Sequence, residues 1–250
     1  MIQIFDIKKA KKNLIKVNDK EDLTEYIKEA KLTKEETLKK YKSNEKKKWI
    51  SYINIKRAID LFLALIALIV LLPLIGIIAL IIKLDSKGPV FFKHTRIGKD
   101  GKIIKIYKFR TMVTNAEELI KKFTPEQLEE YKKNFKLEND PRVTKVGKVL
   151  RKTSLDELPQ LLNIIKGDLA LIGPRPVVKD ELEKYGDNAS KFLSVTPGLT
   201  GNWAANGRSC TSYEDRMEME LWYVDNISLK TDIKIFFKTI IAVIKKEGAV

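Results

Sequence analysis

Residues Leu61–Ile82 read LFLALIALIVLLPLIGIIALII and contain no charged side chain. At about 1.5 Å per residue, a helix of this length covers the ~30 Å hydrocarbon core of a bilayer. A buried helix of a soluble protein is the alternative, but such helices rarely stay apolar on every face. The sequence therefore predicts that this segment anchors the chain in a membrane.

Basic residues flank the apolar segment on both sides. Lys46–Lys48, Lys56 and Arg57 precede it, and six cations follow it: Lys83, Lys87, Lys93, Arg96, Lys99 and Lys102. Cations beside a membrane segment favour the cytoplasmic side, and a single crossing cannot place both flanks there. A proline in mid-helix also removes a backbone hydrogen bond. We therefore expect a re-entrant helix that breaks at Leu72–Pro73 and returns to the cytosolic side.

Composition narrows the class of function. The 250 residues carry a net charge of +15, which calls for an anionic partner: nucleic acid, anionic lipid or a phosphorylated small molecule. With Cys210 as the only cysteine and His94 as the only histidine, Cys/His zinc sites and intramolecular disulfides are excluded. Nucleic acid is disfavoured, because the chain lacks a recognisable recognition helix and has a membrane segment.

Beyond the apolar segment the pattern alternates between strands and helices. Strands are predicted at Val90–Phe92 and Ile103–Phe109, with Gly98–Gly101 as a hairpin connection. Residues 194–207 are rich in Pro, Gly and Asn and are predicted to be a loop. Helices are predicted over 115–137, with a new start at Pro125, and over 155–165, 215–224 and 233–245. The last of these carries an apolar stripe (Ile233, Phe236, Phe237, Ile240, Ile241 and Ile244), which suits either a core or a bilayer surface.

Two adjacent carboxylates, Asp156 and Glu157, stand in the stretch RKTSLDELPQ at 151–160. Ser154 followed three residues later by Glu157 matches a capping box, an ordinary way to begin a helix. The same pair can form a chemical site, since an ionised carboxylate can act as nucleophile and its neighbour can bind a divalent cation. The spacing favours the capping box but leaves both interpretations open.

Two further stretches present cations in settings that suit phosphate. Gly173–Pro176 reads GPRP, where two prolines stiffen the backbone around Arg175 and its bidentate guanidinium. Lys108 and Arg110 follow a predicted strand as a cationic pair. Alone, each stretch is also compatible with a rigid turn or a solvated strand end.

The motifs taken together resemble the bacterial sugar transferases, the monotopic polyprenyl-phosphate glycosyl-1-phosphate transferases. The resemblance covers nearly everything from residue 50 to the C-terminus and rests on the order of these motifs: NIKRAID at 54–60, GPVFF at 88–92, RIG at 96–98, YKFRTM at 107–112, DPR at 140–142, GKVLRKTSLDELPQL at 147–161, GD at 167–168, GPRP at 173–176, PGLTG at 197–201 and GR at 207–208.

The resemblance implies transfer of a sugar 1-phosphate from a UDP-sugar to a polyprenyl phosphate such as undecaprenyl phosphate, giving a lipid diphosphosugar and UMP. This is the first membrane step of exopolysaccharide, capsule or other glycoconjugate synthesis. It further implies that Asp156 attacks the β-phosphorus in a ping-pong reaction and that Glu157 binds Mg²⁺. The implied substrate- and phosphate-binding residues are Arg175, Lys108, Arg110, Arg151 and Arg208.

The expected fold class is α+β and predominantly helical, with a re-entrant N-terminal membrane helix and a cytosolic catalytic domain containing a small β element. Residues 1–48 would be a polar extension, 49–84 the interfacial segment and membrane helix, and 85–250 the catalytic domain with a C-terminal interfacial helix. The expected location is the cytosolic face of the bacterial inner membrane, in contact with anionic lipids. A homodimer is left open, and a non-catalytic membrane-bound lipid-binding or scaffold protein is the alternative.

Overall fold

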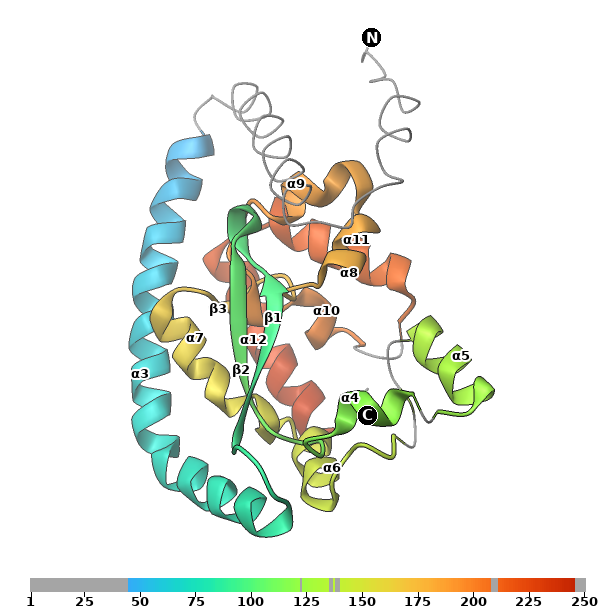
Figure 1. Cartoon of the computed structure of the whole chain (residues 1–250). Helices are drawn as coiled ribbons and strands as arrows, with labels where there is room; N and C mark the ends of the chain where they lie inside the picture. Colours follow the sequence, from blue (N-terminus) through green and yellow to red (C-terminus); the bar gives the residue numbers. More distant parts are fainter. Residues whose placement is uncertain (1–44, 122, 135–136, 138–139, 208–210, 246–250) are drawn as a thin grey trace. The chain divides into compact units, whose positions relative to one another are not determined.

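The computed structural model describes residues 45–121, 123–134, 137, 140–207 and 211–245 (Figure 1). The described helices and strands confirm a predominantly helical chain with small sheets. In chain order they are α3 (Glu45–Asp85), β1 (Phe91–Ile97), η1 (Lys99–Gly101), β2 (Ile103–Phe109), α4 (Ala116–Ile120), α5 (Pro125–Asn134), α6 (Lys145–Lys152), η2 (Leu155–Gln160), α7 (Leu161–Lys166), β3 (Ala170–Ile172), α8 (Lys179–Glu183), η3 (Gly186–Asn188), α9 (Ala189–Phe192), β4 (Gly198–Thr200), α10 (Asn202–Ala205), α11 (Tyr213–Asp225) and α12 (Leu229–Ile244).

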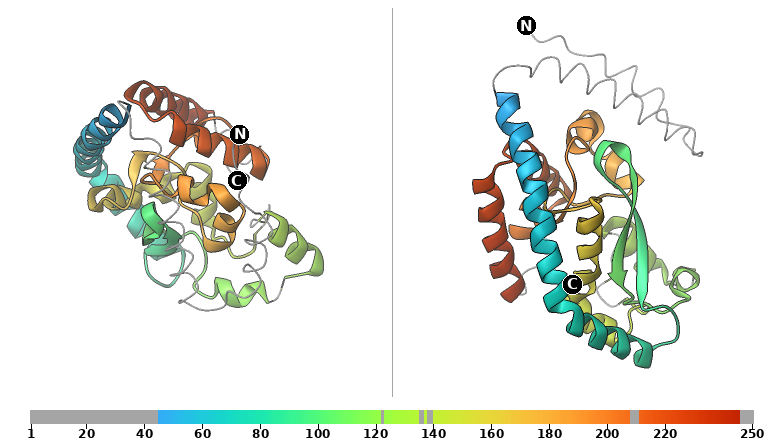
Figure 2. Two further views of the ribbon diagram at one scale, coloured as in Figure 1. Left: turned by 90° about the horizontal axis from the view of Figure 1, so that it is seen from above. Right: turned by 90° about the vertical axis from the view of Figure 1, so that its left-hand side faces the viewer.

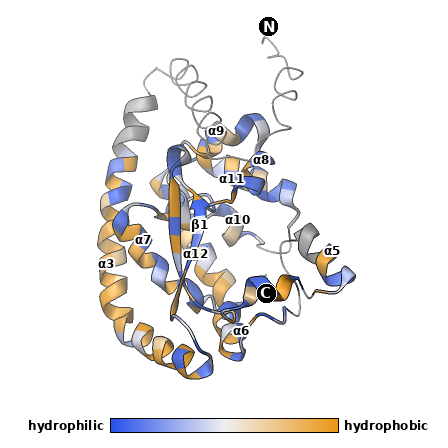
Figure 3. Cartoon of the chain, viewed as in Figure 1, coloured by the Kyte–Doolittle hydropathy of each residue, from blue (hydrophilic) through white to orange (hydrophobic). Residues whose placement is uncertain are grey.

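Helix α3 contains the apolar segment and is the one helix in the described part of the chain that is long and apolar enough to cross a membrane. Only 11% of its most apolar window is buried, and Figure 3 shows mostly hydrophobic residues along the coloured part of the helix. The helix curves in its second half, where Pro73 lies, but it continues to Asp85 (Figure 1). Proline removes one hydrogen bond and so bends a helix without always ending it.

One face of α3 packs against the rest of the chain both before and after Pro73. Ala64 contributes to an apolar cluster with residues of β2 and α7, namely Ile104, Ile106, Leu161 and Ile164. Ile78 and Ile82 contribute to a second cluster with Phe109 of β2 and Leu150 of α6. The apolar helix is therefore part of the same core as the polar portion of the chain.

Polar contacts fix the N-terminal half of α3 to two other helices. Tyr52 Oη donates to Asp232 Oδ2 of α12 at 2.7 Å, and Lys56 Nζ donates to the same oxygen at 2.6 Å. Arg57 donates from both terminal nitrogens to the last backbone carbonyls of α7, at 2.5 and 2.9 Å. Helix α12 accordingly lies beside α3 in both views of Figure 2.

The predicted hairpin is confirmed, with a first strand longer than expected. Strands β1 and β2 pair antiparallel, and the register places Phe92 opposite Lys108 and Arg96 opposite Ile104. A turn of η1 joins them, with Asp100 in the left-handed region at φ 56°. Since alternate residues of a strand share a face, Arg96, His94 and Lys108 stand on one face of the hairpin.

The prediction of an unbroken loop over 194–207 is wrong, because this stretch contains β4 and α10. Strand β4 pairs parallel with β3, so that Ala170 is opposite Gly198 and Ile172 is opposite Thr200. A Cβ on Gly198 would lie 2.1 Å from the backbone nitrogen of Gly173, so only glycine permits this approach. Two glycine-rich stretches that look like loops thus form a tight backbone contact.

Helices α11 and α12 agree with the predicted helices, and the apolar stripe of α12 lies on the surface. The stripe residues are 40–73% exposed, whereas Ile235 and Ala242 on the opposite face are buried. The predicted helix over 115–137 is divided into α4 and α5, with Pro125 at the start of α5 as expected.

Candidate active site

The two adjacent carboxylates lie at the start of η2, a short 3-10 helix that runs directly into α7. Asp156 is buried and Glu157 is half-buried. The capping box is wrong: Ser154 has φ 56° and its side chain makes no capping hydrogen bond. A capping residue needs an extended backbone, whereas Ser154 adopts the left-handed conformation that turns the chain sharply before the pair.

Lys108 of β2 holds the carboxylate pair. Its Nζ lies 2.7 Å from Glu157 Oε1 and 3.8 Å from Asp156 Oδ2, and the three side chains are between 11% and 29% exposed. The hairpin face places this ammonium group directly over η2. The sequence predicts a phosphate contact for Lys108. The structure shows that the ammonium group of Lys108 lies beside both carboxylates.

The electrostatics of Asp156 balance burial against nearby cations. Burial raises the pKa of Asp156 above its usual value, and the charge of Glu157 acts in the same direction. Lys108 and Arg151 oppose this by favouring the ionised carboxylate. A buried carboxylate between cations is poorly solvated yet can remain charged, which suits a nucleophile.

A pocket opens beside the pair between the hairpin, β4 and α10–α11. It is lined by Lys108, Glu157 and Arg175 among the residues singled out from the sequence. It is also lined by residues that the sequence did not single out for the site: His94, Arg96, Trp203 and Glu220. Strand alternation from Lys108 across the hairpin register could have found His94 and Arg96, whereas nothing local marks Trp203 or Glu220.

Two other sequence-predicted cations, Arg110 and Arg151, lie outside the pocket lining. The buried guanidinium of Arg110 donates to the carbonyl of Pro89 at 2.5 Å and to Ser86 Oγ and O at 2.6 and 2.9 Å, so it closes the turn after α3. Arg151 donates from Nε to Thr111 Oγ1 at 2.9 Å and acts on Asp156 through its charge. Arg208 lies outside the described residues.

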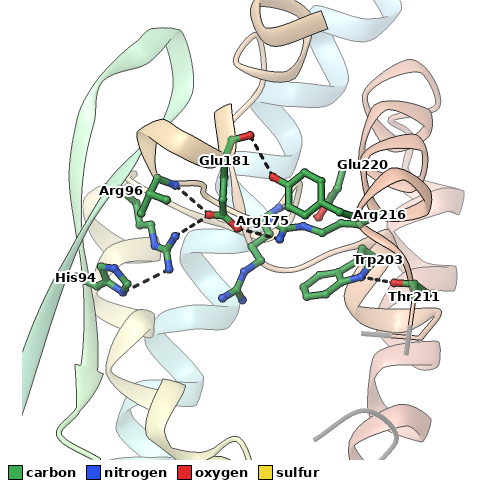
Figure 4. Close-up of polar contacts among 10 residues, drawn as sticks. His94, Arg96, Arg175, Glu181, Trp203, Thr211, Arg216 and Glu220 are labelled. Carbon is green, nitrogen blue, oxygen red and sulfur yellow. Dashed lines mark hydrogen bonds and ion pairs between the residues drawn. The ribbon is translucent and has the colours of Figure 1, made fainter. Parts of the chain in front are cut away.

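A bridged pair of arginines forms the upper wall of the site (Figure 4). Glu181 accepts from Arg96 of β1 at 2.9 Å and from Arg216 of α11 at 3.0 Å. Trp203 lies beneath, with the guanidinium of Arg216 4.7 Å from its ring centre and that of Arg175 5.6 Å away. The guanidinium of Arg175 makes no hydrogen bond or ion pair with the described residues, so it is available to an anionic ligand.

His94 is kept neutral in this setting. Burial lowers its pKa to about 4, helped by the charges of Arg96 and Lys108. A neutral imidazole in the pocket can bind a polar group but adds no charge at neutral pH.

The carboxylate pair fits Mg²⁺ in a limited sense. Mg²⁺ usually takes one or two protein carboxylates and completes its shell with substrate phosphates and water. Glu157 lines the pocket next to Asp156 and so supplies oxygen ligands of the right kind. No group of three or more His, Cys, Asp or Glu side chains among the described residues could hold a metal without such help.

Comparison with known proteins agrees with the geometry. The family described as bacterial sugar transferase matches residues 51–246. The chain is 48% identical over 197 residues to the exopolysaccharide production protein ExoY of Rhizobium meliloti, which covers 78% of this chain and 87% of the relative. It is 44% identical over 198 residues to an undecaprenyl-phosphate galactose phosphotransferase of Salmonella typhimurium, covering 78% of this chain and 41% of the relative.

A third relative, the UDP-glucose:undecaprenyl-phosphate glucose-1-phosphate transferase of Escherichia coli, is 40% identical over 195 residues, covering 74% of this chain and 39% of the relative. The chain thus spans about two fifths of the length of these two larger relatives. The family match covers the membrane helix, the hairpin, the carboxylate pair and the pocket alike. On this basis the chain belongs to the bacterial sugar transferase family.

Proposed function

We propose that the protein transfers a sugar 1-phosphate from a UDP-sugar to a polyprenyl phosphate such as undecaprenyl phosphate, as the first membrane step of exopolysaccharide or capsule synthesis. The observation that carries the proposal is the buried Asp156 beside Glu157, held by Lys108 at the edge of a pocket with an available Arg175. Two relatives support the proposal by their names. One is an undecaprenyl-phosphate galactose phosphotransferase, and the other is a UDP-glucose:undecaprenyl-phosphate glucose-1-phosphate transferase.

The proposed reaction has two displacements at one phosphorus. An Oδ of Asp156 attacks the β-phosphorus of the UDP-sugar, the bond to the bridging oxygen breaks, and UMP leaves with that oxygen. The phosphosugar is then bound to the enzyme as an aspartyl phosphate. An oxygen of the polyprenyl phosphate attacks the same phosphorus, the bond to Asp156 breaks, and the carboxylate is restored. Proton donors are not required, which fits a site with a single, neutral histidine.

The neighbouring residues have separate tasks in this scheme. Lys108 keeps Asp156 ionised and neutralises charge on the diphosphate, and Arg175 binds a phosphate oxygen pair. Glu157 would hold Mg²⁺, which supplies further neutralisation of the diphosphate when bound.

The carboxylate test compares wild type with one variant and uses two readouts. Asp156→Asn should abolish UMP release from UDP-sugars in the presence of undecaprenyl phosphate, because an amide is a poor nucleophile. Wild type incubated with a sugar-labelled donor and no acceptor should retain label on the protein, and the variant should not. Full UMP release by Asp156→Asn would refute the assignment. Absence of UMP release by wild type with every donor of a UDP-sugar panel would instead favour the lipid-binding or scaffold alternative.

We also propose that α3 is re-entrant and places the site at the cytosolic face of the inner membrane. Tyr52 to Asp85 would extend about 50 Å as a helix, well beyond the ~30 Å core. The helix nevertheless packs on the catalytic portion before and after Pro73, and its following residue Ser86 is bound by Arg110. A crossing helix would draw the charged elements that pack on it into the hydrocarbon, which is costly.

Topology can be tested by cysteine labelling. Cys210 is first replaced by serine, since it is the only cysteine. Single cysteines at Lys47 and Lys99 should then react with a membrane-impermeant maleimide from the same side of inside-out vesicles. Labelling of the two positions from opposite sides would overturn the re-entrant arrangement.

A further inference from the structure

Glu220 of α11 is a buried carboxylate with one oxygen left without a partner. It is 1% exposed, and its Oε1 accepts from the backbone nitrogen of Arg175 at 3.1 Å. Oε2 is buried and makes no hydrogen bond. Burying an unpartnered carboxylate oxygen is costly, so a partner is expected when the site is in use.

Glu220 belongs to the wall of the pocket. Glu220 lines it together with Glu157, Arg175 and Trp203. Gly201 stands next to Oε2, and a Cβ built on this glycine would lie 3.6 Å from the oxygen. Gly201 lines the pocket too, and without a side chain it places only its backbone between Oε2 and the pocket, so a small shift would let a ligand group reach the oxygen.

The surroundings limit what can bind there. The nearby cations, Arg175 and Arg216, act on Glu220 through their charge. Among the described contacts, Arg216 pairs with Glu181 and not with Glu220. A phosphate group would be repelled by the carboxylate, and a cationic ligand would be repelled by the two guanidinium groups. The group that fits Oε2 is therefore a neutral hydrogen-bond donor.

We propose that Glu220 Oε2 accepts a hydrogen bond from a hydroxyl group of the donor substrate, on one of the two sugar rings that the diphosphate links. The inference rests on the proposed function. Oε1 is tied to the backbone of Arg175, whose guanidinium is available for phosphate, and both residues line one pocket, so a phosphate at Arg175 and a hydroxyl at Oε2 would belong to the same ligand. In a nucleotide sugar two such rings carry hydroxyls, the ribose and the transferred sugar.

The consequence is selectivity. A site that buries a polar group for a substrate hydroxyl rejects an analogue without that hydroxyl, because the group is then left unpaired. If the ring is the transferred sugar, Glu220 helps to decide which sugar the enzyme accepts. If the ring is ribose, Glu220 makes the enzyme specific for ribonucleotide donors.

The alternative is a structural water. Arg216 Nε and the hydroxyl of Tyr185 are also buried without partners, so a water could join them to Glu220. In that case the carboxylate would serve the fold and not the ligand, and ligand discrimination would not depend on it.

The test measures binding by titration calorimetry on the full chain in detergent. An Asp156→Asn background prevents turnover, and Glu220→Gln is compared with Glu218→Gln, which removes an exposed carboxylate from the same helix. Glu220→Gln should weaken UDP-sugar binding about 10- to 100-fold, and Glu218→Gln should leave it unchanged. Thermal denaturation of both variants checks that they are folded.

Two ligand series identify the ring. An equal loss of affinity for UMP and UDP-sugar assigns the hydroxyl to ribose, and then the penalty for 2′- or 3′-deoxy-UMP seen with the parent should vanish in Glu220→Gln. An unchanged affinity for UMP assigns it to the transferred sugar, and then the penalty for a deoxy sugar should vanish. Unchanged affinity for both ligands, or deoxy penalties that persist in the variant, would overturn the proposal and leave the structural water.

The pH dependence gives an independent readout. Burial raises the pKa of Glu220 to about 7, while the backbone N–H of Arg175 and the charges of Arg216 and Arg175 oppose the increase. An ionised carboxylate is the stronger acceptor, so UDP-sugar affinity should increase between pH 6 and pH 8. The same titration of Glu220→Gln should be flat. Failure of the proposed function is recognised separately, as absence of UMP release by wild type while UDP-sugars still bind.

Discussion

Arg57 offers the sharpest test of how helix α3 supports the proposed catalytic pair, Asp156 and Glu157. Its two terminal nitrogens donate to the carbonyls of Ile164 and Ile165 at the end of α7, and its guanidinium lies over Gly167. Helix α7 follows directly on η2, which carries Asp156. Arg57 is thus the cation at the negative end of the short helix that supports the carboxylate pair.

The expected loss follows from these two bonds. Hydrogen bonds to a charged group contribute roughly 1.5–3 kcal/mol each, and the half-buried position of Arg57 argues for the lower value. Arg57→Gln should therefore destabilise the protein by about 3 kcal/mol. For a chain of this size that corresponds to a decrease in Tm of roughly 6–12 °C. Arg57→Lys keeps the charge but has one terminal nitrogen in place of the two that donate, so its loss of stability should be about half as large.

The assay is thermal denaturation in detergent micelles, followed by UMP release at a temperature where all variants are folded. Lys83→Gln is the matched control, because it removes an exposed cation from the same helix. We expect Arg57→Gln to lose activity as well as stability, since the end of α7 is no longer fixed. A Tm of Arg57→Gln within about 2 °C of the Lys83→Gln control would refute the reasoning.

Three further outcomes are expected. Ser154→Val should destabilise by about 1–2 kcal/mol, measured as Tm, because a β-branched residue resists the left-handed backbone at φ 56°, whereas Ser154→Gly should stay within about 1 kcal/mol of wild type. Lys108→Gln should shift the acid limb of the pH–rate profile to higher pH, because the charge of Lys108 lowers the pKa of Asp156 and so opposes the effect of burial. An acid limb at the wild-type pH would contradict this. Glu220→Gln should raise Tm at pH 8 but not at pH 4. Burial raises the pKa of Glu220 from 4.5 to about 7 in the folded protein. Ionising this carboxyl therefore costs the folded state up to about 3 kcal/mol as the pH rises from the unfolded pKa through the folded pKa, and glutamine avoids that cost.

The anchor, the hairpin and the carboxylate pair could be predicted because each is local in sequence. Leu61–Ile82 is a continuous apolar run, the hairpin has its glycines at the turn, and Asp156 and Glu157 are adjacent. The prediction of a capping box was wrong because of the backbone conformation of Ser154. Sequence spacing shows that the Ser154 and Glu157 side chains could reach each other's backbone N–H groups, but it does not show that Ser154 adopts the left-handed conformation.

Arg110 shows a different limit. The pattern Lys-Phe-Arg suggests that Lys108 and Arg110 point the same way, as alternate residues of a strand do. Strand β2 ends at Phe109, and Arg110 is bound by Ser86 and Pro89, residues more than twenty positions earlier. The spacing of residues in the sequence does not predict such a partner. Only the structure shows that Lys108 lies beside the carboxylates whereas Arg110 closes a turn.

The recognition residues were missed because they come together only through topology. Arg96 lies on β1, Trp203 on α10 and Glu220 on α11, and no local sequence pattern connects the three. Glu181 links Arg96 to Arg216 across the top of the site, and the side chains of both ion pairs are at most 14% exposed. Buried ion pairs of this kind add little to stability, since desolvation offsets the attraction, and the place of Arg96 in the pocket wall fits a role in positioning the proposed ligand.

The hairpin therefore connects the two parts of the site with the membrane helix. Lys108 on β2 touches the carboxylate pair, and Arg96 on β1 reaches the upper wall through Glu181. The same face of β2, through Ile104 and Ile106, belongs to the apolar cluster that includes Ala64 of α3. A shift of α3 within the bilayer would move β2 with it, because a close-packed core transmits displacement. The depth of the helix and the geometry of the pocket are thus set by the same contacts, which accounts for a membrane helix that packs on its catalytic portion and does not merely tether it.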